Sequence, residues 1–272
     1  MVKENDYLPR LHSEILSIMD CIDSVCKCNG IRYYLIGGTL LGAIRHNGFI
    51  PWDDDLDIVM PRDDFNRFVT IMVEEKPYQL RLEWITTNPK YYRLFAKVCR
   101  PNTRFAEDMG NGRSSDFGIF VDVFPLDATN GYNKNVMFRK WVESKINVMI
   151  SEKAYPSTRK GIKQAVIKLF SFRFLHKVSF FFMHYPVFKK YGYYTNFGSH
   201  YDAKRQTMPK AYYGDGIEYT FEDRKFIIPS NYDAVLRSIF GNKYMEIPPK
   251  SKQITHHPLF VQFSDGSFIN FD

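Results

Sequence analysis

The chain has few cysteines and no long apolar run. Its four cysteines, Cys21, Cys26, Cys28 and Cys99, have no paired zinc spacing, so we expect reduced structural thiols of a cytoplasmic protein. No uncharged apolar stretch reaches the ~20 residues that a bilayer-spanning helix needs. The polar start, Met1 to Pro9, lacks the charged-then-apolar pattern of a signal peptide. These absences predict a cytoplasmic protein.

Acidic residues are missing from one long segment. From Lys153 to Tyr201 there are nine Lys and Arg and no Asp or Glu, which leaves 28 basic and 30 acidic residues elsewhere. A nucleic-acid-binding protein would spread or stripe its positive charge over the fold, so we expect no nucleic acid partner. Apolar and basic residues interleave in the segment at helical spacing. This pattern fits peripheral contact of residues 153–201 with the anionic inner face of a membrane, and it fits a buried helical hairpin with solvated lysines equally well.

The stretch from Ile36 to Met60 carries the clearest chemistry. A short apolar strand, Tyr33 to Ile36, should lead into a turn at Gly37 and Gly38, with Thr39 capping the next helix. A glycine turn that opens a helix presents unpaired N–H groups and the positive end of the helix dipole, which suits phosphate. We therefore predict that Gly37, Gly38 and Thr39 bind phosphate.

Four aspartates follow within five positions, 53 to 57. On a strand from Asp55 to Met60, alternation places Asp55 and Asp57 on one face, about 6.6 Å apart, and apolar residues on the other. Two such carboxylates can converge on one hard cation. An acidic run is ordinarily a solvated turn, but the apolar residues of this strand indicate burial, where bare charge is costly without a partner. A metal site is the better interpretation.

A third carboxylate comes from a later strand, 117–124. Asp122 stands alone between Val121 and Val123, and a lone acid in an apolar strand needs a metal or a donor. Three such acids suit metal-assisted phosphoryl or nucleotidyl transfer. Asp127 lies beyond Pro125 and is expected to cap the following turn. Arg93, Lys97 and Arg104 are candidates to line a substrate groove.

Several motifs together resemble a known family. The motifs are Gly37-Gly38-Thr39, residues 48–58 (GFIPWDDDLDI), residues 120–127 (FVDVFPLD), and residues 240–245 (FGNKYM) running into Pro248-Pro249. They resemble the signature of LicD-type phosphotransferases, which belong to the nucleotidyltransferase superfamily and are related to fukutin-type proteins. By the same resemblance, the lysine on a predicted strand, Lys97, should contact phosphate.

The expected fold class is α/β (α+β), a small mixed sheet of nucleotidyltransferase type flanked by helices, with a basic helical insertion. Residues 1–130 should form the catalytic core, and residues 131–272 should supply the insertion and C-terminal elements. The patterns predict helices over 8–28, 61–75, 133–151, 194–206 and 232–240, strands over 79–87 and 91–99, and hairpins turning at 222–223 and 265–266. In the helix over 133–151, the expected inward residues are Val136, Met137, Trp141, Ile146 and Met149. His256 and His257 have no metal spacing.

The resemblance implies transfer of a phospho-alcohol, often phosphocholine from CDP-choline, to a hydroxyl of a cell-surface glycan or its lipid-linked precursor, as in lipopolysaccharide, teichoic acid or capsule synthesis. Other CDP-alcohols, of ribitol or glycerol, remain open, as does transfer of NMP from an NTP to a small molecule. An inactive scaffold of the same fold is a third alternative.

In this interpretation Asp55, Asp57 and Asp122 hold one or two Mg²⁺, with Mn²⁺ as an alternative, and Asp122 also takes the proton from the acceptor hydroxyl. Choline is a quaternary ammonium that is best held over aromatic faces. Trp52, fixed by Pro51 beside the acids, is the best single candidate, and Asp53 would add charge complementarity.

Overall fold

The structure is a computed structural model that describes residues 4–110, 112–156, 167, 169–184, 191–253 and 258–271. The helices are α1 (Glu4–Asn29), α2 (Gly37–His46), α3 (Arg62–Glu74), α4 (Lys134–Ala154), α6 (Phe172–His184), α7 (Lys210–Tyr213) and α8 (Tyr232–Phe240), with 3-10 turns at Pro77–Gln79 and Lys250–Lys252. The strands are β1 (Tyr34–Leu35), β2 (Asp57–Pro61), β3 (Arg81–Glu83), β4 (Ala96–Cys99), β5 (Arg104–Gly110), β6 (Arg113–Asp116), β7 (Phe120–Thr129), β8 (Tyr193–Thr195), β9 (Thr207–Pro209), β10 (Ile217–Phe221), β11 (Arg224–Ile228), β12 (Pro258–Gln262) and β13 (Phe268–Asn270).

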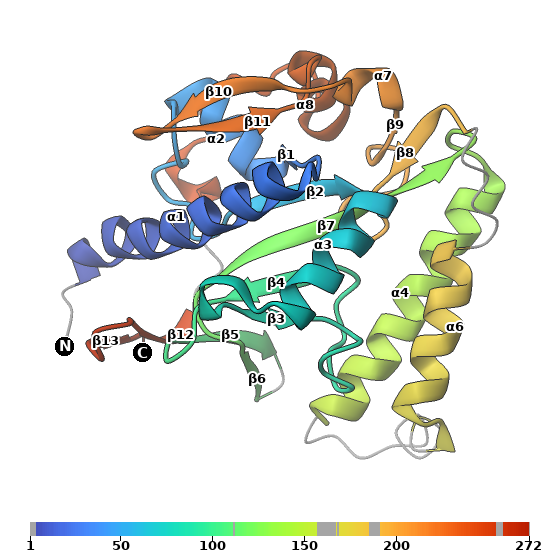
Figure 1. The fold of residues 1–272 in the computed structure, drawn as a ribbon, viewed down its shortest axis with the longest axis horizontal. Helices are drawn as coiled ribbons and strands as arrows, with labels where there is room; N and C mark the ends of the chain where they lie inside the picture. The colour runs from blue at the N-terminus through green and yellow to red at the C-terminus, as the bar shows by residue number, and fades with distance from the viewer. Residues whose placement is uncertain are drawn as a thin grey trace.

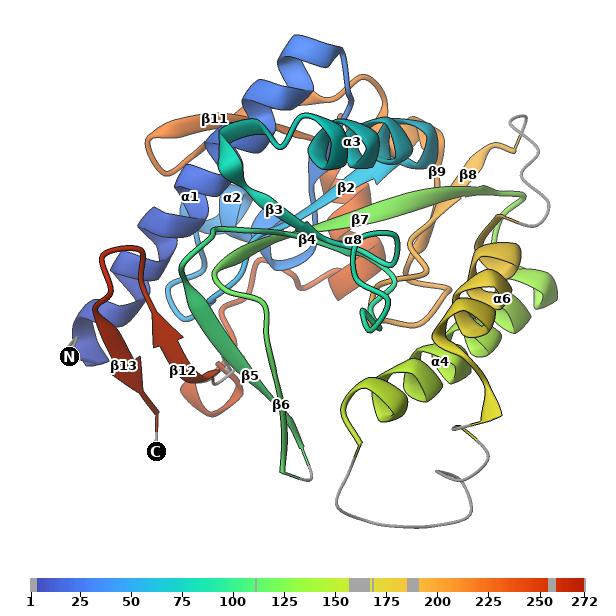
Figure 2. The same cartoon turned by 60° about the horizontal axis from the view of Figure 1, so that its bottom comes forward.

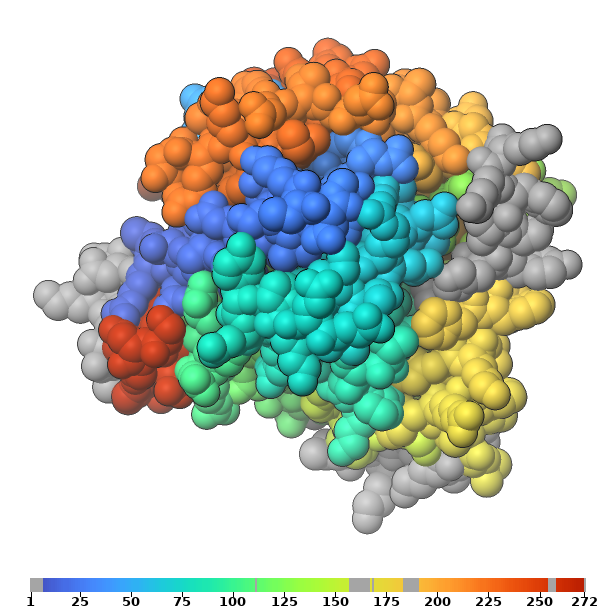
Figure 3. Space-filling view, in the orientation of Figure 1, coloured from blue at the N-terminus to red at the C-terminus, as the bar shows by residue number. Residues whose placement is uncertain are grey.

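The core is a mixed sheet in the order β1-β2-β7-β4-β3, extended by β8 and β9. β7 is the central strand, runs parallel to β2 and antiparallel to β4, and buries nine of its ten residues. It crosses the middle of the molecule in Figure 1, and α1 and α3 pack against it. The space-filling view shows α1 (blue) and the segment from α3 to β3 (turquoise) covering this side of the sheet (Figure 3). The predicted fold class is confirmed.

Two hairpins extend the structure around this sheet. β10 and β11 form the predicted hairpin that turns at 222–223, and α8 covers the predicted range. The C-terminal hairpin, β12 and β13, is also confirmed, and β12 pairs with β5 to build a second sheet in the order β13-β12-β5-β6. The two predicted strands over 79–87 and 91–99 are shorter, since only β3 and β4 form their ladder. His256 and His257 lie outside the described residues.

The second half of the chain adds a helix pair, α4 and α6, which run side by side at one end of the sheet (Figures 1 and 2). In α4, Val136, Ile146 and Met149 pack inward as expected, but Met137 and Trp141 are exposed, so that part of the prediction was wrong.

The prediction of a helix over 194–206 was also wrong, because a short strand, β8, and a loop occupy that range. Much of the basic segment, residues 157–166, 168 and 185–190, lies outside the described residues.

Asp127 does not cap a turn. Its carboxylate is 1% exposed and receives two hydrogen bonds of 2.8 Å from the guanidinium of Arg62, the first residue of α3. The pair is bidentate and buried, the geometry in which arginine holds a carboxylate best. It therefore joins α3 to β7, which is a long-range role that local sequence does not reveal.

A buried acid lies between the two helices of the pair. Glu143 of α4 is 0% exposed, and Ser179 of α6 donates a hydrogen bond of 2.7 Å to its Oε2. Burial raises the pKa of the Glu143 carboxyl to about 8. The folded chain therefore keeps this carboxyl protonated at neutral pH, whereas the unfolded chain ionises it above about 4.5.

We expect Glu143→Gln to flatten the pH dependence of stability. Because the folded-state pKa is raised, Glu143 contributes stability that is fully present below pH 4.5 and is lost as the pH rises to about 8. The wild type should lose about 2 to 4 kcal/mol more than the variant between pH 5 and 8 in urea unfolding. Glu74→Gln, at an exposed position at the end of α3, is the control and should keep the wild-type slope. Parallel slopes for wild type and Glu143→Gln would contradict the assignment.

Candidate active site

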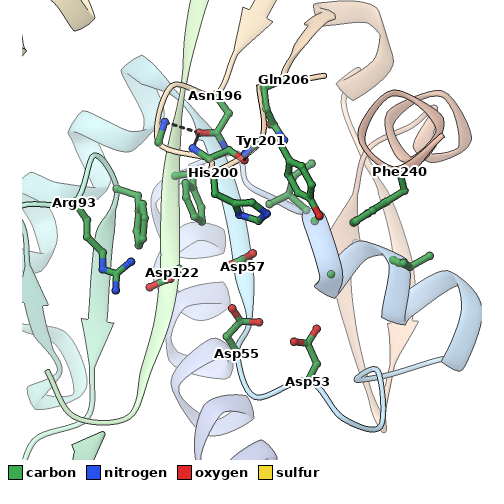
Figure 4. Close-up of a pocket in the computed structure, with 18 of the residues that line it drawn as sticks. Asp53, Asp55, Asp57, Arg93, Asp122, Asn196, His200, Tyr201, Gln206 and Phe240 are labelled. Atoms are coloured by element: carbon green, nitrogen blue, oxygen red, sulfur yellow. Dashed lines mark hydrogen bonds between the residues drawn. The ribbon is translucent and has the colours of Figure 1, made fainter. Parts of the chain in front are cut away.

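A cleft of about 1060 Å³ opens where the sheet, α2 and the second half of the chain meet. Its acidic side carries Asp53, Asp55, Asp57 and Asp122, whose carboxylates surround one open space in Figure 4. Gly37, Gly38, Trp52 and Arg93 also line it. Of the predicted site residues, Thr39, Lys97 and Arg104 do not. The functional roles assigned to all of them stay predictions.

Strand pairing brings two of the acids together. Asp57 on β2 and Asp122 on β7 are direct neighbours in the parallel register, and the N–H of Asp122 donates to the carbonyl of Leu56 at 2.9 Å. Neighbouring residues in register point to the same side of a sheet. Leu56, Ile58 and Met60 are fully buried as predicted, but Val59, on the side of the acids, is fully buried too. β2 begins at Asp57, so Asp55 lies before the strand, and the predicted alternation is present only in part. Residues 65 positions apart in the chain thus present carboxylates to one cleft.

The glycines let α2 begin against these acids. A Cβ on Gly38 would lie 2.7 Å from Oδ2 of Asp53, and one on Gly37, whose φ is +59°, would lie 3.3 Å from Oδ2 of Asp57. Larger residues would therefore push the helix away from the carboxylates. This close approach is the structural reason for the glycine pair.

Thr39 is not the helix cap. The helix begins at Gly37, the cap position is Ile36, and no side chain caps it. The hydroxyl oxygen of Thr39 instead accepts the backbone N–H of Asp57 at 2.8 Å. Thr39 thus ties the start of α2 to the strand that carries the acids.

Lys97 is the principal partner of Asp122. It stands opposite Asp122 on β4, with its Nζ 3.0 Å from Oδ1 and 3.3 Å from Oδ2. The side chain is 1% exposed, and Nζ also lies 3.0 Å from the centroid of the Phe120 ring. The predicted contact with phosphate would require Lys97 to leave this position, and it stays a prediction. Arg104 pairs with Asp116 and does not line the cleft.

Arg93 reaches the cleft directly. Its guanidinium donates to both carboxylate oxygens of Glu107 at 3.1 Å, and both residues line the cleft beside Asp122 (Figure 4). The acidic side is therefore flanked by a cation that a negatively charged substrate would meet.

The carboxylates suit a magnesium ion, since oxygen ligands are those that hard cations prefer. Burial raises the pKa of Asp122 to about 6, although the charges of Lys97 and Arg93 lower it. Its buried Oδ1 lies within ion-pair distance of Lys97 but receives no hydrogen bond from any described residue. Such an oxygen fits a metal ligand. No three His, Cys, Asp or Glu among the described residues are already grouped as a metal site, so an ion would have to draw these acids together.

The sequence analysis missed the opposite wall, the loop 196–206. Oδ1 of Asn196 accepts the N–H groups of Gly198 and Ser199, and Nζ of Lys140 on α4 donates to the carbonyls of Phe197 and Ser199. This loop presents His200, Tyr201 and Gln206 to the cleft (Figure 4). The composition N-F-G-S-H, rich in turn-forming residues, was the available signal for a loop.

Aromatic rings border the acids. Trp52 is half-buried and meets His46 edge-on at 6.1 Å between centroids. Tyr201 meets Phe240 edge-on at 5.8 Å and stacks near His200 at 4.0 Å. The cleft therefore combines anionic oxygens with aromatic faces, a combination that suits an organic cation.

A mixed sheet that gathers acids from adjacent strands beside a glycine-opened helix is typical of the nucleotidyltransferase class. Residues 30–159 match the family model described as LicD/FKTN/FKRP, nucleotidyltransferase domain. The chain is also 32% identical over 251 residues to the lipopolysaccharide cholinephosphotransferase LicD of Haemophilus influenzae, covering 89% of this chain and 92% of that protein. The chain belongs to the LicD family, as the motifs predicted.

A shorter match links it to the fukutin-related branch. Forty residues are 50% identical to the ribitol 5-phosphate transferase FKRP of Homo sapiens and of Mus musculus, covering 15% of this chain and 8% of each relative.

We expect Lys97 and Asp122 to be coupled in stability. Lys97→Met leaves a buried carboxylate without its cation, which should lower the unfolding free energy by about 3 kcal/mol. Adding Asp122→Asn should recover part of this loss, as a double-mutant cycle by urea unfolding would show. Lys76→Met, at an exposed position, is the control. If Lys97→Met kept its stability but bound the CDP-linked alcohol more weakly, a direct contact of Lys97 with phosphate would be favoured instead.

Proposed function

We propose that the protein transfers phosphocholine from CDP-choline to a hydroxyl of a cell-surface glycan or its lipid-linked precursor, in a reaction that depends on a divalent metal. The pairing of Asp57 with Asp122 in one register, with Asp55 on the same cleft, carries the proposal. The relative that spans most of the chain is a lipopolysaccharide cholinephosphotransferase, which supports choline as the alcohol. The shorter match to a ribitol 5-phosphate transferase keeps ribitol as the second candidate.

In the proposed reaction the acceptor hydroxyl oxygen attacks the phosphorus that carries choline, and the bond from that phosphorus to the oxygen of CMP breaks. Asp55, Asp57 and Asp122 would hold one or two Mg²⁺, or Mn²⁺. Bound there, the metal would neutralise the diphosphate and stabilise the leaving CMP. Asp122 would take the proton of the acceptor hydroxyl as the general base.

Other residues of the cleft position the donor. Gly37 and Gly38 line the cleft at the start of α2, and their N–H groups would donate to the diphosphate oxygens. The Arg93 guanidinium adds a positive charge beside Asp122 (Figure 4). Such a site acts by positioning and charge stabilisation, so no covalent nucleophile is required.

The deciding experiment offers the protein CDP-choline, CDP-ribitol, CDP-glycerol and NTPs, each with Mg²⁺ and a glycan acceptor. We expect CMP release with CDP-choline and phosphocholine on the acceptor. Faster turnover of CDP-ribitol than of CDP-choline would identify ribitol as the transferred alcohol. Pyrophosphate release from an NTP would instead identify a nucleotidylyltransferase. Absence of turnover and of Mg²⁺ binding by calorimetry would indicate an inactive scaffold.

We expect Asp57→Asn to remove activity while the fold stays intact. Losing one metal-binding carboxylate should raise the barrier by about 3 kcal/mol or more, which is about a hundredfold in rate. Less repulsion among the acids should leave stability without metal equal or higher. Asp223→Asn, on the exposed turn between β10 and β11, is the matched control and should keep full activity. Full activity in Asp57→Asn would exclude the proposed site.

We expect Trp52→Ala to discriminate between donors. If Trp52 holds the quaternary ammonium, CDP-choline should bind about 1 to 2 kcal/mol more weakly, whereas CDP-ribitol and CDP-glycerol should change little. Trp141→Ala is the control, since Trp141 is exposed on α4 and does not line the cleft. Calorimetry with the three donors measures the difference, and equal losses for charged and neutral donors would refute the cation site.

A further inference from the structure

One side of α4 is unusually apolar for a surface. Trp141, Phe138 and Val148 are 58%, 53% and 56% exposed. Together with Met137, they recur at a spacing that puts them on one side of the helix. Lys134 and Lys145 lie on the same side, and both are exposed. Nζ of Lys145 stands 5.9 Å from the Trp141 ring.

The neighbouring helix α6 repeats this arrangement. Phe174 and Phe181 are 49% and 56% exposed, and the exposed Arg173 and Lys177 share their side of the helix. The two sides are joined, because Phe182 lies 6.1 Å from Phe138 of α4 and 5.4 Å from Phe181. We call this continuous surface of α4 and α6 the helix-pair face.

The helix-pair face carries no unpaired acid among the described residues. In α4, Glu143 is fully buried, and Glu152, which the helical spacing puts on the same side as Val148, is 23% exposed and pairs with Arg113. α6 contains no acid. Tryptophan and phenylalanine next to Lys and Arg, without unpaired acids, are typical of helices that lie in the interface of an anionic bilayer. An ordinary solvated face would not gather six exposed apolar side chains around its cations.

We propose that the helix-pair face docks the protein on the surface of an anionic lipid bilayer. Contact is peripheral, because no helix among the described residues is long and apolar enough to cross a membrane. The aromatic rings enter the headgroup region, and the four cations contact anionic headgroups.

The position of α4 connects this face to the cleft. Lys140, Ser144 and Asn147, on the adjacent side of the same helix, line the cleft wall. Docking therefore brings the cleft mouth beside the bilayer, where an acceptor carried by a lipid would present its hydroxyl. This last step rests on the proposed function, whereas the docking itself does not.

The test is co-sedimentation of the full chain with vesicles of phosphatidylcholine, with and without phosphatidylglycerol, in the absence of donor. We expect binding only with phosphatidylglycerol, and a steep loss of binding as salt rises. Phe138→Ser/Trp141→Ser and Lys145→Gln/Lys177→Gln should each weaken binding about tenfold or more. The matched controls are Tyr78→Ser/Leu259→Ser, at exposed apolar positions elsewhere, and Lys76→Gln/Lys225→Gln, which removes the same charge.

Other outcomes separate this proposal from its competitors. Equal binding to both vesicle types, no binding, or equal losses in the control variants would overturn it. Sedimentation equilibrium showing a dimer that Phe138→Ser/Trp141→Ser dissociates would assign the face to a second copy of the chain instead. Turnover with a water-soluble acceptor should be unchanged in Phe138→Ser/Trp141→Ser, so failure of the docking and failure of the proposed chemistry can be told apart.

Discussion

The parallel pairing of β2 with β7 is the constraint on which the site depends. It sets Asp57 beside Asp122 in one register, and so concentrates negative charge at the edge of the apolar core. Carboxylates at such a position are costly unless cations or donors compensate them. Lys97, placed opposite Asp122 by the antiparallel partner β4, supplies that compensation from within the sheet. Three strands thus fix both the charges and their counter-charge.

The rest of the cleft accommodates this charged centre. The glycine pair allows the start of α2 to approach Asp53 and Asp57, and the hydroxyl of Thr39 holds the helix to β2. Arg93 is kept at the cleft by Glu107 rather than by the central acids. Lys97 and Arg93 therefore place positive charge beside the acids that would hold the ion in the proposed reaction.

The second half of the chain turns this charged edge into an enclosed cleft. Lys140 of α4 holds the loop 196–206 through two backbone carbonyls, and that loop carries His200 and Tyr201 over the acids. The same helix exposes Trp141 and Phe138 on another side. α4 is thus both a wall of the site and, in our proposal, part of the membrane contact, which would place donor, acceptor and lipid surface close together.

The sequence alone determined what depends on local pattern: the two hairpins, α8, the family, and Asp55, Asp57 and Asp122 as candidate acids, which share one cleft. Strand period and turn chemistry act over a few residues, so they can be read directly. Tertiary structure decided the rest. Asp127 became the partner of Arg62, Thr39 a link to β2, Lys97 the buried partner of Asp122, and residues 196–206 a loop over the cleft. Each outcome depends on a partner distant in the chain, and on the cost of burying a polar group without one.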